Sequence, residues 1–382
     1  MPNKVEIVVG GDICPTDDTR IFFENNDTDS LLNEVKSVLT SADLLVGNME
    51  FPLTDNCQKA IKTGPILYGK EEYIEFFKAA GFTALGLGNN HIKDCGKRGV
   101  LSSLEICKSN GIKTVGAGIN ERKAKKPLII ERNGLKVGIM AFAEHEFNAA
   151  YENEPGANLF DVYTDYDQIE SFKKDVDYLI IMYHGGIEYY PYPSPLLQKK
   201  CRKMIDKGAD YVTCQHSHTI GVEEKHNHGI ILYGQGNMIY GYRKYDLDWN
   251  EGLLIKINLE GKGEVLDVSI EYIPIKTTRT SNIRPMNKKE SESLFLKMLN
   301  RCGRLKEDGF IEDNWTKFCE SKKSLYLPQL YGKSRIFNKL NRIFNNKLIK
   351  LSYSDKNLMI TKNIIRCESH NEVISSILNR DK

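Results

Sequence analysis

Five short segments in the first 240 residues carry side chains that bind metal ions, and each follows a short apolar run. Carboxylate, amide and imidazole groups of this kind coordinate divalent cations in enzymes. A glycine or another small residue in each segment lets the chain turn sharply. Five such segments in succession predict a single active site, and a metal-dependent hydrolase fits it best. The segments are Gly11-Asp12, Gly47-Asn48-Met49-Glu50, Gly88-Asn89-Asn90-His91, Tyr183-His184-Gly185-Gly186 and Gln215-His216-Ser217-His218.

The side-chain types in these segments predict a site for one or two divalent metal ions. Carboxylates are natural bridges between two cations, and neutral imidazoles favour Mn, Fe, Zn or Co over Mg or Ca. Two cations ~3.5–4 Å apart can activate water and hold both oxygens of an in-line phosphoryl displacement. The two imidazoles of His216 and His218 can therefore bind one ion or one in each of two sites, with Mn, Fe or Zn as the candidates. The expected metal ligands are Asp12, Glu50, Asn90, His184, His216 and His218.

A catalytic role is expected for His91. It directly follows Asn90, and two adjacent residues rarely both reach one cation. We therefore expect His91 to point at the leaving group or at a phosphate oxygen as a general acid. Imidazoles at such sites are usually oriented by a partner, such as a carboxylate, that hydrogen-bonds to the second ring nitrogen. Asp94 is therefore expected to orient His91, and Glu188 to orient His184.

Short buried strands that alternate with helices must position these segments. The strands are apolar on both faces, as in a parallel sheet covered on both sides. The segments between them have the apolar stripe of amphipathic helices. Such alternation predicts an α/β domain whose strand ends converge on one crevice. The expected strands are 5–9, 44–46, 84–87, 179–182 and 211–214, and the expected helices are 29–39, 71–80, 100–110 and 194–207.

A second set of strands has hairpin character. Residues 127–131 and 136–142 flank Asn133-Gly134, a strong two-residue turn signal. Residues 230–233, 253–259 and 265–275 follow later in the chain. Together the two sets predict two sheets lying face to face with helices outside.

The order and spelling of the segments resemble the calcineurin-like metallophosphoesterases, and within them the CapA-type proteins of capsule and poly-γ-glutamate biosynthesis. In that branch the motifs run GD, N-x-E-x-P-L-T, NNH-x-x-D-x-G, H-x-G-x-E-Y and H-x-H-x-x-G. The resemblance covers roughly residues 4–275 and implies a four-layer α/β/β/α fold with a two-metal site. The matching stretches here are 11–12, 48–54, 89–96, 184–189 and 216–221, followed by 233–238.

The chain departs from the general phosphoesterase pattern at two positions. That pattern opens with D-x-H, whereas this chain has Cys14 in place of the histidine, either as a soft ligand or as a buried neutral thiol. The second motif of the pattern carries a bridging Asp. Here Asn48 and Glu50 stand in that place, so Glu50 is the expected bridge and Asn48 a supporting or substrate-contacting residue.

Charge divides the chain into two regions. Residues 1–275 hold 30 Lys and Arg against 40 Asp and Glu, whereas residues 276–382 hold 23 against 11. We expect a CapA-type domain over 1–276 and a basic, mostly helical region over 277–382. Residues 333–350 have one apolar and one basic face, so this helix either docks on its own domain or touches a membrane surface.

The remaining features suggest compartment and partners. Nine cysteines without a C-x-x-C pair predict reduced thiols. No signal peptide is recognisable at the start, so we expect a cytoplasmic protein, including the inner face of the membrane. The aromatic segment 189–193 forms either a wall of the substrate cleft or a self-packed surface loop. The near-neutral net charge of +2 gives no indication of nucleic-acid binding.

These features lead to one main functional hypothesis and two alternatives. The main hypothesis is a phosphoesterase-like enzyme of bacterial capsule or surface-polymer synthesis, which acts on a phosphorylated small molecule or polymer precursor beside polymer synthase proteins. The first alternative is a non-catalytic, metal-binding scaffold of a synthase complex at the membrane. The second alternative is metal-assisted amide chemistry on a γ-glutamyl polymer.

Overall fold

The first sheet of the computed structural model is built around the N-terminal strand β1. Its strand order is β16-β15-β14-β1-β2-β3-β4, and β13 also pairs with β1. The pairs between β1 and β4 are parallel, whereas β14, β15 and β16 add antiparallel strands on the other side. The strands are β1 (Asn3–Ile13), β2 (Leu44–Met49), β3 (Ala84–Gly86), β4 (Lys113–Val115), β13 (Asn237–Ile239), β14 (Glu251–Lys262), β15 (Val265–Thr277) and β16 (Ile283–Pro285). The structure describes residues 3–16, 18–262, 265–330, 335–345, 347–348, 355–367, 369–371 and 373–374.

The second sheet has a parallel centre and antiparallel edges. Its order is β11-β12-β10-β9-β7-β6. The expected hairpin joins β6 to β7, and both turn residues, Asn133 and Gly134, have positive φ angles of 51° and 78°, as a tight two-residue turn requires. The strands are β6 (Leu128–Arg132), β7 (Leu135–Ala143), β9 (Tyr178–His184), β10 (Tyr211–Gln215), β11 (Glu223–His226) and β12 (Gly229–Leu232), and a small separate sheet pairs β5 (Ala117–Gly118) with β8 (Gly156–Ala157).

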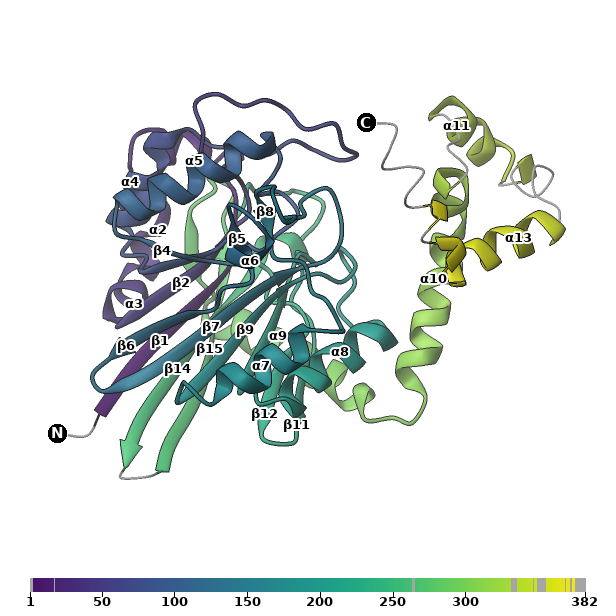
Figure 1. The fold of residues 1–382 in the computed structure, drawn as a ribbon. Coiled ribbons are helices and arrows are strands. Elements are labelled where there is room, and N and C mark those ends of the chain that lie inside the picture. Colours follow the sequence, from purple (N-terminus) through teal and green to yellow (C-terminus); the bar gives the residue numbers. More distant parts are fainter. Residues whose placement is uncertain are drawn as a thin grey trace. The chain divides into compact units, whose positions relative to one another are not determined.

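Three apolar cores separate four layers, as expected (Figure 1). Alternation along the strands creates them, because successive side chains point to opposite faces. Val8 of β1 packs under the first helical layer, and Val9 packs between the sheets. Ile180 of β9 also packs between the sheets, whereas Ile181 packs under the second helical layer. The α/β/β/α architecture is therefore confirmed.

The helices fall close to their predicted positions, with two differences. The helix expected over 71–80 begins as the 3-10 turn Glu71–Tyr73 and continues as α4 (Ile74–Ala79). The helix expected over 29–39 is divided into α2 (Thr28–Leu32), a 3-10 turn and α3 (Lys36–Ser41). The apolar stripe is kept across the break, since Leu31, Val35 and Leu39 are all buried. The other helices of the four layers are α1 (Arg20–Glu24), α4 (Ile74–Ala79), α5 (Gly96–Ser109), α6 (Glu121–Ala124), α7 (Asp165–Lys173) and α8 (Pro195–Asp206).

The first compact unit extends beyond the expected boundary at residue 276. Helix α9 (Lys288–Leu305) buries Leu294 and Met298 in the core between the sheets. Asn287 and Glu290 start this helix with a reciprocal capping box, which satisfies otherwise unpaired backbone N–H groups. The chain accordingly divides into Met1–Ile311 and Glu312–Lys382.

The second unit is helical in the residues that the structure describes, as expected. It contains most of α10 (Phe310–Leu330), together with α11 (Arg335–Ile343) and α13 (Asp355–Arg366). Of the helix predicted over 333–350, residues 333, 334, 346, 349 and 350 lie outside the described part. The side chains of Ile336 and Ile343 on α11 are exposed. Among the described residues, no helix is both long and apolar enough to cross a bilayer.

Candidate metal centre

The ends of five strands, three from the first sheet and two from the second, bring the predicted residues together. Parallel pairing places Asp12 of β1 opposite Asn48 of β2, and also opposite Asn237 of β13. In the second sheet, His184 ends β9 opposite Gln215, the last residue of β10. Because both sheets present the carboxyl ends of these strands at the same edge, their side chains converge on one buried cluster.

Asp12 connects the two sheets within this cluster. Its Oδ1 accepts a hydrogen bond from Asn48 Nδ2 at 2.7 Å, and its Oδ2 accepts one from the backbone N–H of His216 at 3.0 Å. His218 Nδ1 lies 3.6 Å from the same Oδ2. Asn48 therefore has the supporting position expected from the sequence.

Glu50 is completely buried and only half satisfied. Its Oε2 accepts a hydrogen bond from the Tyr240 hydroxyl at 2.8 Å. Its Oε1 has no hydrogen-bond partner among the described residues and lies 3.4 Å from His184 Nε2. Since an unpaired buried carboxylate oxygen is costly, this atom marks a place where a cation would be stabilising.

His184 is held by amide side chains and not by the expected Glu188. Its Nδ1 lies 3.1 Å from Asn48 Nδ2, and its Nε2 lies 3.0 Å from Asn90 Oδ1. Glu188 is exposed, although the next residue, Tyr189, returns to the cluster through its N–H, which donates to Ser217 O at 2.8 Å. The expectation that Glu188 orients His184 is therefore wrong.

His216 and His218 adopt backbone conformations that residues other than glycine rarely use. Their φ angles are 79° and 51°, in the left-handed region, and such strain concentrates at functional sites. His218 Nδ1 lies 2.9 Å from Asn237 Oδ1, whereas His216 Nδ1 is buried and has no hydrogen-bond partner in the part of the chain that the structure describes. The strained loop thus aims both imidazoles at the cluster.

The residues present fit a metal centre. Potential ligand atoms of Glu50, His184 and His216 lie within 4.8 Å of one another, and so do those of Asp12, Glu50 and His218. Glu50 belongs to both groups, which agrees with a bridging position between two cations. Two buried atoms without partners, Glu50 Oε1 and His216 Nδ1, are themselves ligand types for such ions.

Burial sets the charge state of the cluster. It raises the pKa of the Asp12 carboxyl, and the nearby Glu50 raises this pKa further. It lowers the pKa of His184 to about 4 and that of His216 well below its ordinary value, with His184 and His218 adding to the effect on His216. The two imidazoles are therefore neutral at pH 7 and have lone pairs to donate, while a cation would compensate the buried carboxylates.

His91 and Asp94 form a pair beside the cluster, as the sequence predicts. His91 Nδ1 lies 2.7 Å from Asp94 Oδ2, and His91 Nε2 faces Glu50 Oε1 at 3.9 Å. Asn90 lies between the pair and the imidazole of His184, with its amide nitrogen 3.5 Å from Glu146. This geometry leaves Nε2 as the atom of His91 that can exchange a proton at the site.

Cys14 lies beside the cluster as a protonated thiol. Burial raises its pKa well above the ordinary value, and the carboxylate of Glu50 raises it further. It belongs to neither ligand group among the described residues. The neutral thiol that the sequence left open is thus the state that the structure supports.

An aromatic wall adjoins His218. Its ring packs 4.6 Å from Trp249 and 5.0 Å from Tyr240. Tyr189 of the aromatic segment lies 6.5 Å from His218, and its hydroxyl accepts a hydrogen bond from Arg243 at 3.0 Å. Of the two possibilities for residues 189–193, the structure supports the wall for Tyr189.

Sequence reasoning missed several residues of the site. Glu146 follows the end of β7, and Asn237 begins β13, so a search around strand ends could have found both. Tyr240 directly follows the end of β13, so the same search could have found it. Trp249 lies in the 3-10 turn Asp248–Asn250 and Lys62 in a loop, where residue type and spacing give no comparable signal.

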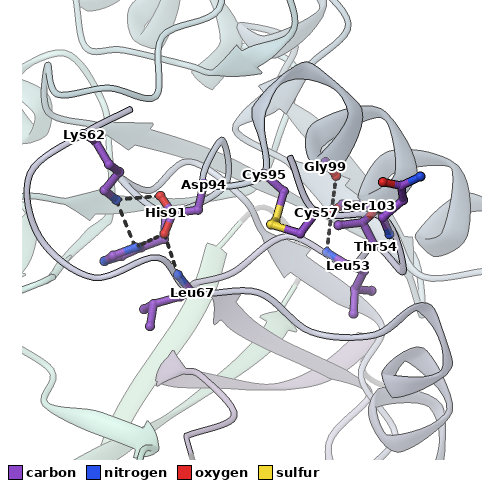
Figure 2. The surroundings of a disulfide bond; sticks show 11 residues. Leu53, Thr54, Cys57, Lys62, Leu67, His91, Asp94, Cys95, Gly99 and Ser103 are labelled. Atoms are coloured by element: carbon purple, nitrogen blue, oxygen red, sulfur yellow. Dashed lines mark hydrogen bonds and ion pairs between the residues drawn. A yellow bond between two sulfur atoms is a disulfide. The ribbon is translucent and has the colours of Figure 1, made fainter. Parts of the chain in front are cut away.

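One cysteine pair contradicts the expectation of reduced thiols. Cys57 and Cys95 form a disulfide with a Cα–Cα distance of 4.7 Å (Figure 2). Their separation of 38 residues follows no recognisable spacing, so the pairing was invisible in the sequence. Four other cysteines, Cys14, Cys107, Cys201 and Cys214, are free and buried.

Comparisons with known proteins agree with the motif order. The family model described as "Bacterial capsule synthesis protein PGA_cap" matches residues 6–242. "Capsule biosynthesis protein CapA" of Bacillus anthracis is 29% identical over 279 residues, which are 69% of this chain and 66% of that protein. "PGA biosynthesis protein CapA" of Bacillus subtilis (strain 168) is 29% identical over 249 residues, 63% of this chain and 64% of that protein. The chain thus spans just under two thirds of the length of these two relatives.

Solved structures show more distant likenesses. A 5'-nucleotidase precursor from Thermus thermophilus matches 80% of this chain and 60% of its own, with 13% identity and a TM-score of 0.40. A hypothetical protein from the same organism matches 70% of this chain and 99% of its own, with 11% identity and a TM-score of 0.42. Scores this low carry no functional weight.

Proposed function

Because the chain belongs to the bacterial capsule synthesis protein family PGA_cap, we propose that it is a metal-dependent phosphoesterase-like hydrolase of capsule or surface-polymer synthesis. Its substrate would be a phosphorylated small molecule or a polymer precursor. The names of the two Bacillus relatives, which refer to capsule and PGA biosynthesis, support the placement in polymer synthesis.

The observation that carries the proposal is the position of Glu50. Its carboxylate is common to both potential ligand groups, and its Oε1 is buried without a partner. In the proposed centre, His184 and His216 would share one divalent ion with Glu50. Asp12 and His218 would share a second ion with the same carboxylate, and Asn90 would add a neutral ligand beside His184. Mn, Fe and Zn suit this mixture of oxygen and nitrogen donors.

The protein side chains divide the remaining work. Bound divalent ions would supply an activated water and stabilise charge on phosphoryl oxygens. His91, fixed by Asp94 through Nδ1, would give a proton from Nε2 to the leaving oxygen. The wall of Trp249 and Tyr189 would exclude water from one side of the cleft, and Arg243 beside it offers a cation for an anionic substrate.

The test of this proposal compares wild type with His91→Ala in the presence of Mn²⁺. We expect hydrolysis of bis-p-nitrophenyl phosphate or p-nitrophenyl phosphate by the wild type, and a roughly 10²–10⁴-fold lower kcat for the variant, the range typical of a lost general acid. His226→Ala is the matched control, because His226 ends β11 outside the cluster and pairs with Asp206 at 2.8 Å. If neither wild type nor variant hydrolyses either ester despite bound metal, the phosphoesterase proposal fails.

Such an outcome would favour the non-catalytic scaffold, and the departure at Cys14 is the observation behind it. A protonated thiol there leaves one ligand fewer than in the general phosphoesterase pattern. The alternative of amide chemistry is tested separately, by incubating the metal-loaded protein with poly-γ-glutamate and measuring chain length. Unchanged chain length would rule against it.

The Cys57–Cys95 disulfide bears on the compartment. Structural disulfides persist in oxidising environments and are rare in the cytoplasm of mesophiles. We therefore place this domain in an oxidising compartment in preference to the cytoplasm expected from the sequence. Alkylation of free thiols before cell lysis, followed by mass spectrometry, would show Cys57 and Cys95 unmodified if this placement is right.

A further inference from the structure

A loop beside the candidate centre carries a buried lysine that the proposed mechanism does not use. Residues 54–68 form no helix or strand, and the loop closes on itself where Leu53 pairs with Gly69. Thr54 N–H donates to Gly69 O at 2.8 Å, and Leu53 N–H donates to Ser103 Oγ of α5 at 2.7 Å. These hydrogen bonds fix the two ends of the 54–68 loop. Contacts made by residues within the loop determine the course of the rest (Figure 2).

Lys62 points inward from the most exposed part of this loop. Its neighbour Ile61 is 94% exposed, whereas the Lys62 side chain is only 2% exposed. Its Nζ lies 2.5 Å from Asp94 Oδ1 and 3.3 Å from His91 Nδ1. Burying an ammonium group is costly unless an opposite charge compensates it, and Asp94, itself 1% exposed, supplies that charge.

Asp94 is the residue around which the loop is wrapped. Its Oδ2 accepts the Leu67 N–H at 2.7 Å, and its backbone oxygen accepts the Ala60 N–H at 2.8 Å. Lys62 Nζ contacts the remaining side-chain oxygen, Oδ1, so three loop residues contact three different oxygen atoms of Asp94. No regular secondary structure fixes this segment, so these contacts determine where it lies.

The contacts also determine how His91 is oriented. A lysine ammonium can only donate hydrogen bonds, and an ionised carboxylate can only accept them. His91 Nδ1 cannot both accept from Lys62 and donate to Asp94, and its distance to Asp94, 2.7 Å, is the shorter. The proton on Nδ1 therefore points to Asp94 Oδ2, while Lys62 donates to the other oxygen, Oδ1. Nε2 of His91 is then the nitrogen that faces the cluster.

The disulfide joins the same loop to the residue that follows Asp94. Cys57 lies near the start of the loop, and Cys95 directly follows Asp94. The covalent bond keeps the segment that carries Lys62 beside Asp94 (Figure 2). It also shortens the part of the loop that can move freely. Constraining a chain in this way reduces the alternatives open to it.

We propose that Lys62 is a positioning residue for the candidate catalytic pair. The 54–68 loop, tethered by Cys57–Cys95, brings its ammonium group to Asp94 and so holds His91 in one orientation. The catalytic consequence rests on the proposed phosphoesterase function. The position of the 54–68 loop against Asp94, which we call the seating of the loop, does not.

The first test measures the seating without reference to activity, by hydrogen exchange of the Ala60 and Leu67 amides. Lys62→Met is expected to speed exchange at these amides at least about 10-fold, because Asp94 loses its counter-charge and its hold on the loop. Lys62→Arg should restore most of the protection. Lys70→Met is the matched control, since Lys70 lies at the end of the same segment and pairs with Glu24 and Glu72 at the surface. Exchange in Lys62→Met equal to that of the control would overturn the proposal.

The second test breaks the tether. Dithiothreitol reduces the S–S bond, so that each cysteine sulfur gains one electron and one proton while the dithiol closes into its own disulfide. In wild type, reduction should speed hydrogen exchange at the Leu67 amide. In the double variant Cys57→Ser/Cys95→Ser, exchange at this amide should already be fast, and dithiothreitol should not change it. If wild type shows two new thiols by mass but unaltered exchange, the disulfide does not seat the loop.

The third test is kinetic and separates positioning from substrate binding. Lys62→Met should lower kcat about 10-fold or more with KM within about 2-fold of wild type, and Lys62→Arg should recover part of the loss. A kcat unchanged in Lys62→Met would contradict the positioning role. An inactive wild type would instead contradict the proposed phosphoesterase function, and the exchange measurements would still decide the seating of the loop.

Discussion

Glu50 is the buried carboxylate that belongs to both potential ligand groups of the site. A fully buried carboxylate with one satisfied oxygen and one unpaired oxygen is unfavourable in an empty pocket. The neighbouring imidazoles cannot supply the missing charge at pH 7, since burial holds the pKa of His184 at about 4. A divalent cation would both satisfy Oε1 and use the neutral imidazoles as ligands.

Replacing Glu50 by glutamine tests this interpretation at the residue scale. Glu50→Gln keeps the size and the hydrogen bond to Tyr240 but removes the charge, so Mn²⁺ affinity should fall at least about 10-fold, equivalent to ~1.4 kcal/mol. The metal-free variant should be as stable as wild type or more stable, because a buried charge is gone. Calorimetric titration and thermal unfolding measure the two effects.

Glu188→Gln is the control for this experiment, because Glu188 is exposed and its loss should leave Mn²⁺ affinity unchanged. If Glu50→Gln binds Mn²⁺ as tightly as this control, Glu50 is not a ligand.

At the scale of elements, α9 shows how packing extends the domain beyond its sheets. Two of its side chains, Leu294 and Met298, fill the core between the two sheets, whereas Leu296 on the same helix is 58% exposed. The charge pattern placed this helix in the basic C-terminal region, but its burial makes it part of the first compact unit.

A pair of leucine substitutions on α9 measures this packing. Leu294→Ala should reduce the free energy of unfolding by about 2–5 kcal/mol through lost burial and a residual cavity. Leu296→Ala, at an exposed position, should change it by less than about 0.5 kcal/mol. Urea unfolding followed by tryptophan fluorescence distinguishes the two, and equal effects would show that α9 does not belong to the sandwich core.

The start of α9 makes a pH-dependent contribution. The bidentate contact with Arg284 lowers the pKa of Glu290 to about 2, from 4.5. A carboxylate whose pKa is lower in the folded protein stabilises it above the unfolded pKa, and this stabilisation is lost as pH falls toward the folded pKa. Glu290→Gln preserves the capping acceptor and removes the charge.

We therefore expect Glu290→Gln to melt about 1–3 °C below wild type at pH 7. The gap should narrow as pH is lowered from 4.5 toward about 2, and scanning calorimetry across this range measures it. A gap that stays constant, or that widens at low pH, would show that the charge of Glu290 is not responsible.

Strand periodicity made much of the element scale predictable. Short apolar runs indicated the strands, and because parallel strands end at a common edge, the residues after them had to meet. Asp12, Glu50 and His184 were predictable on this ground. The break between α2 and α3 was not, because the apolar stripe continues across the 3-10 turn and leaves no sign of it in the residue pattern.

At the scale of the whole molecule, the contacts that sequence reasoning missed join segments far apart in the chain. The disulfide links residues 38 positions apart, and Trp249 packs against His218 from a 3-10 turn that follows β13. Glu188 was expected to orient His184, yet it is exposed, and Asn48 and Asn90 contact the imidazole in its place. The motifs located the centre, but loop conformations decide what surrounds it.

The central claim is that two divalent ions share Glu50, and an anomalous-scattering map from crystals soaked with Mn²⁺ near pH 7 tests it most directly. We expect two peaks, one among Glu50, His184 and His216 and one among Asp12, Glu50 and His218. A single peak would reduce the centre to one metal and remove the bridging role of Glu50. The absence of any peak at both positions would contradict the metal centre and, with it, the proposed hydrolase.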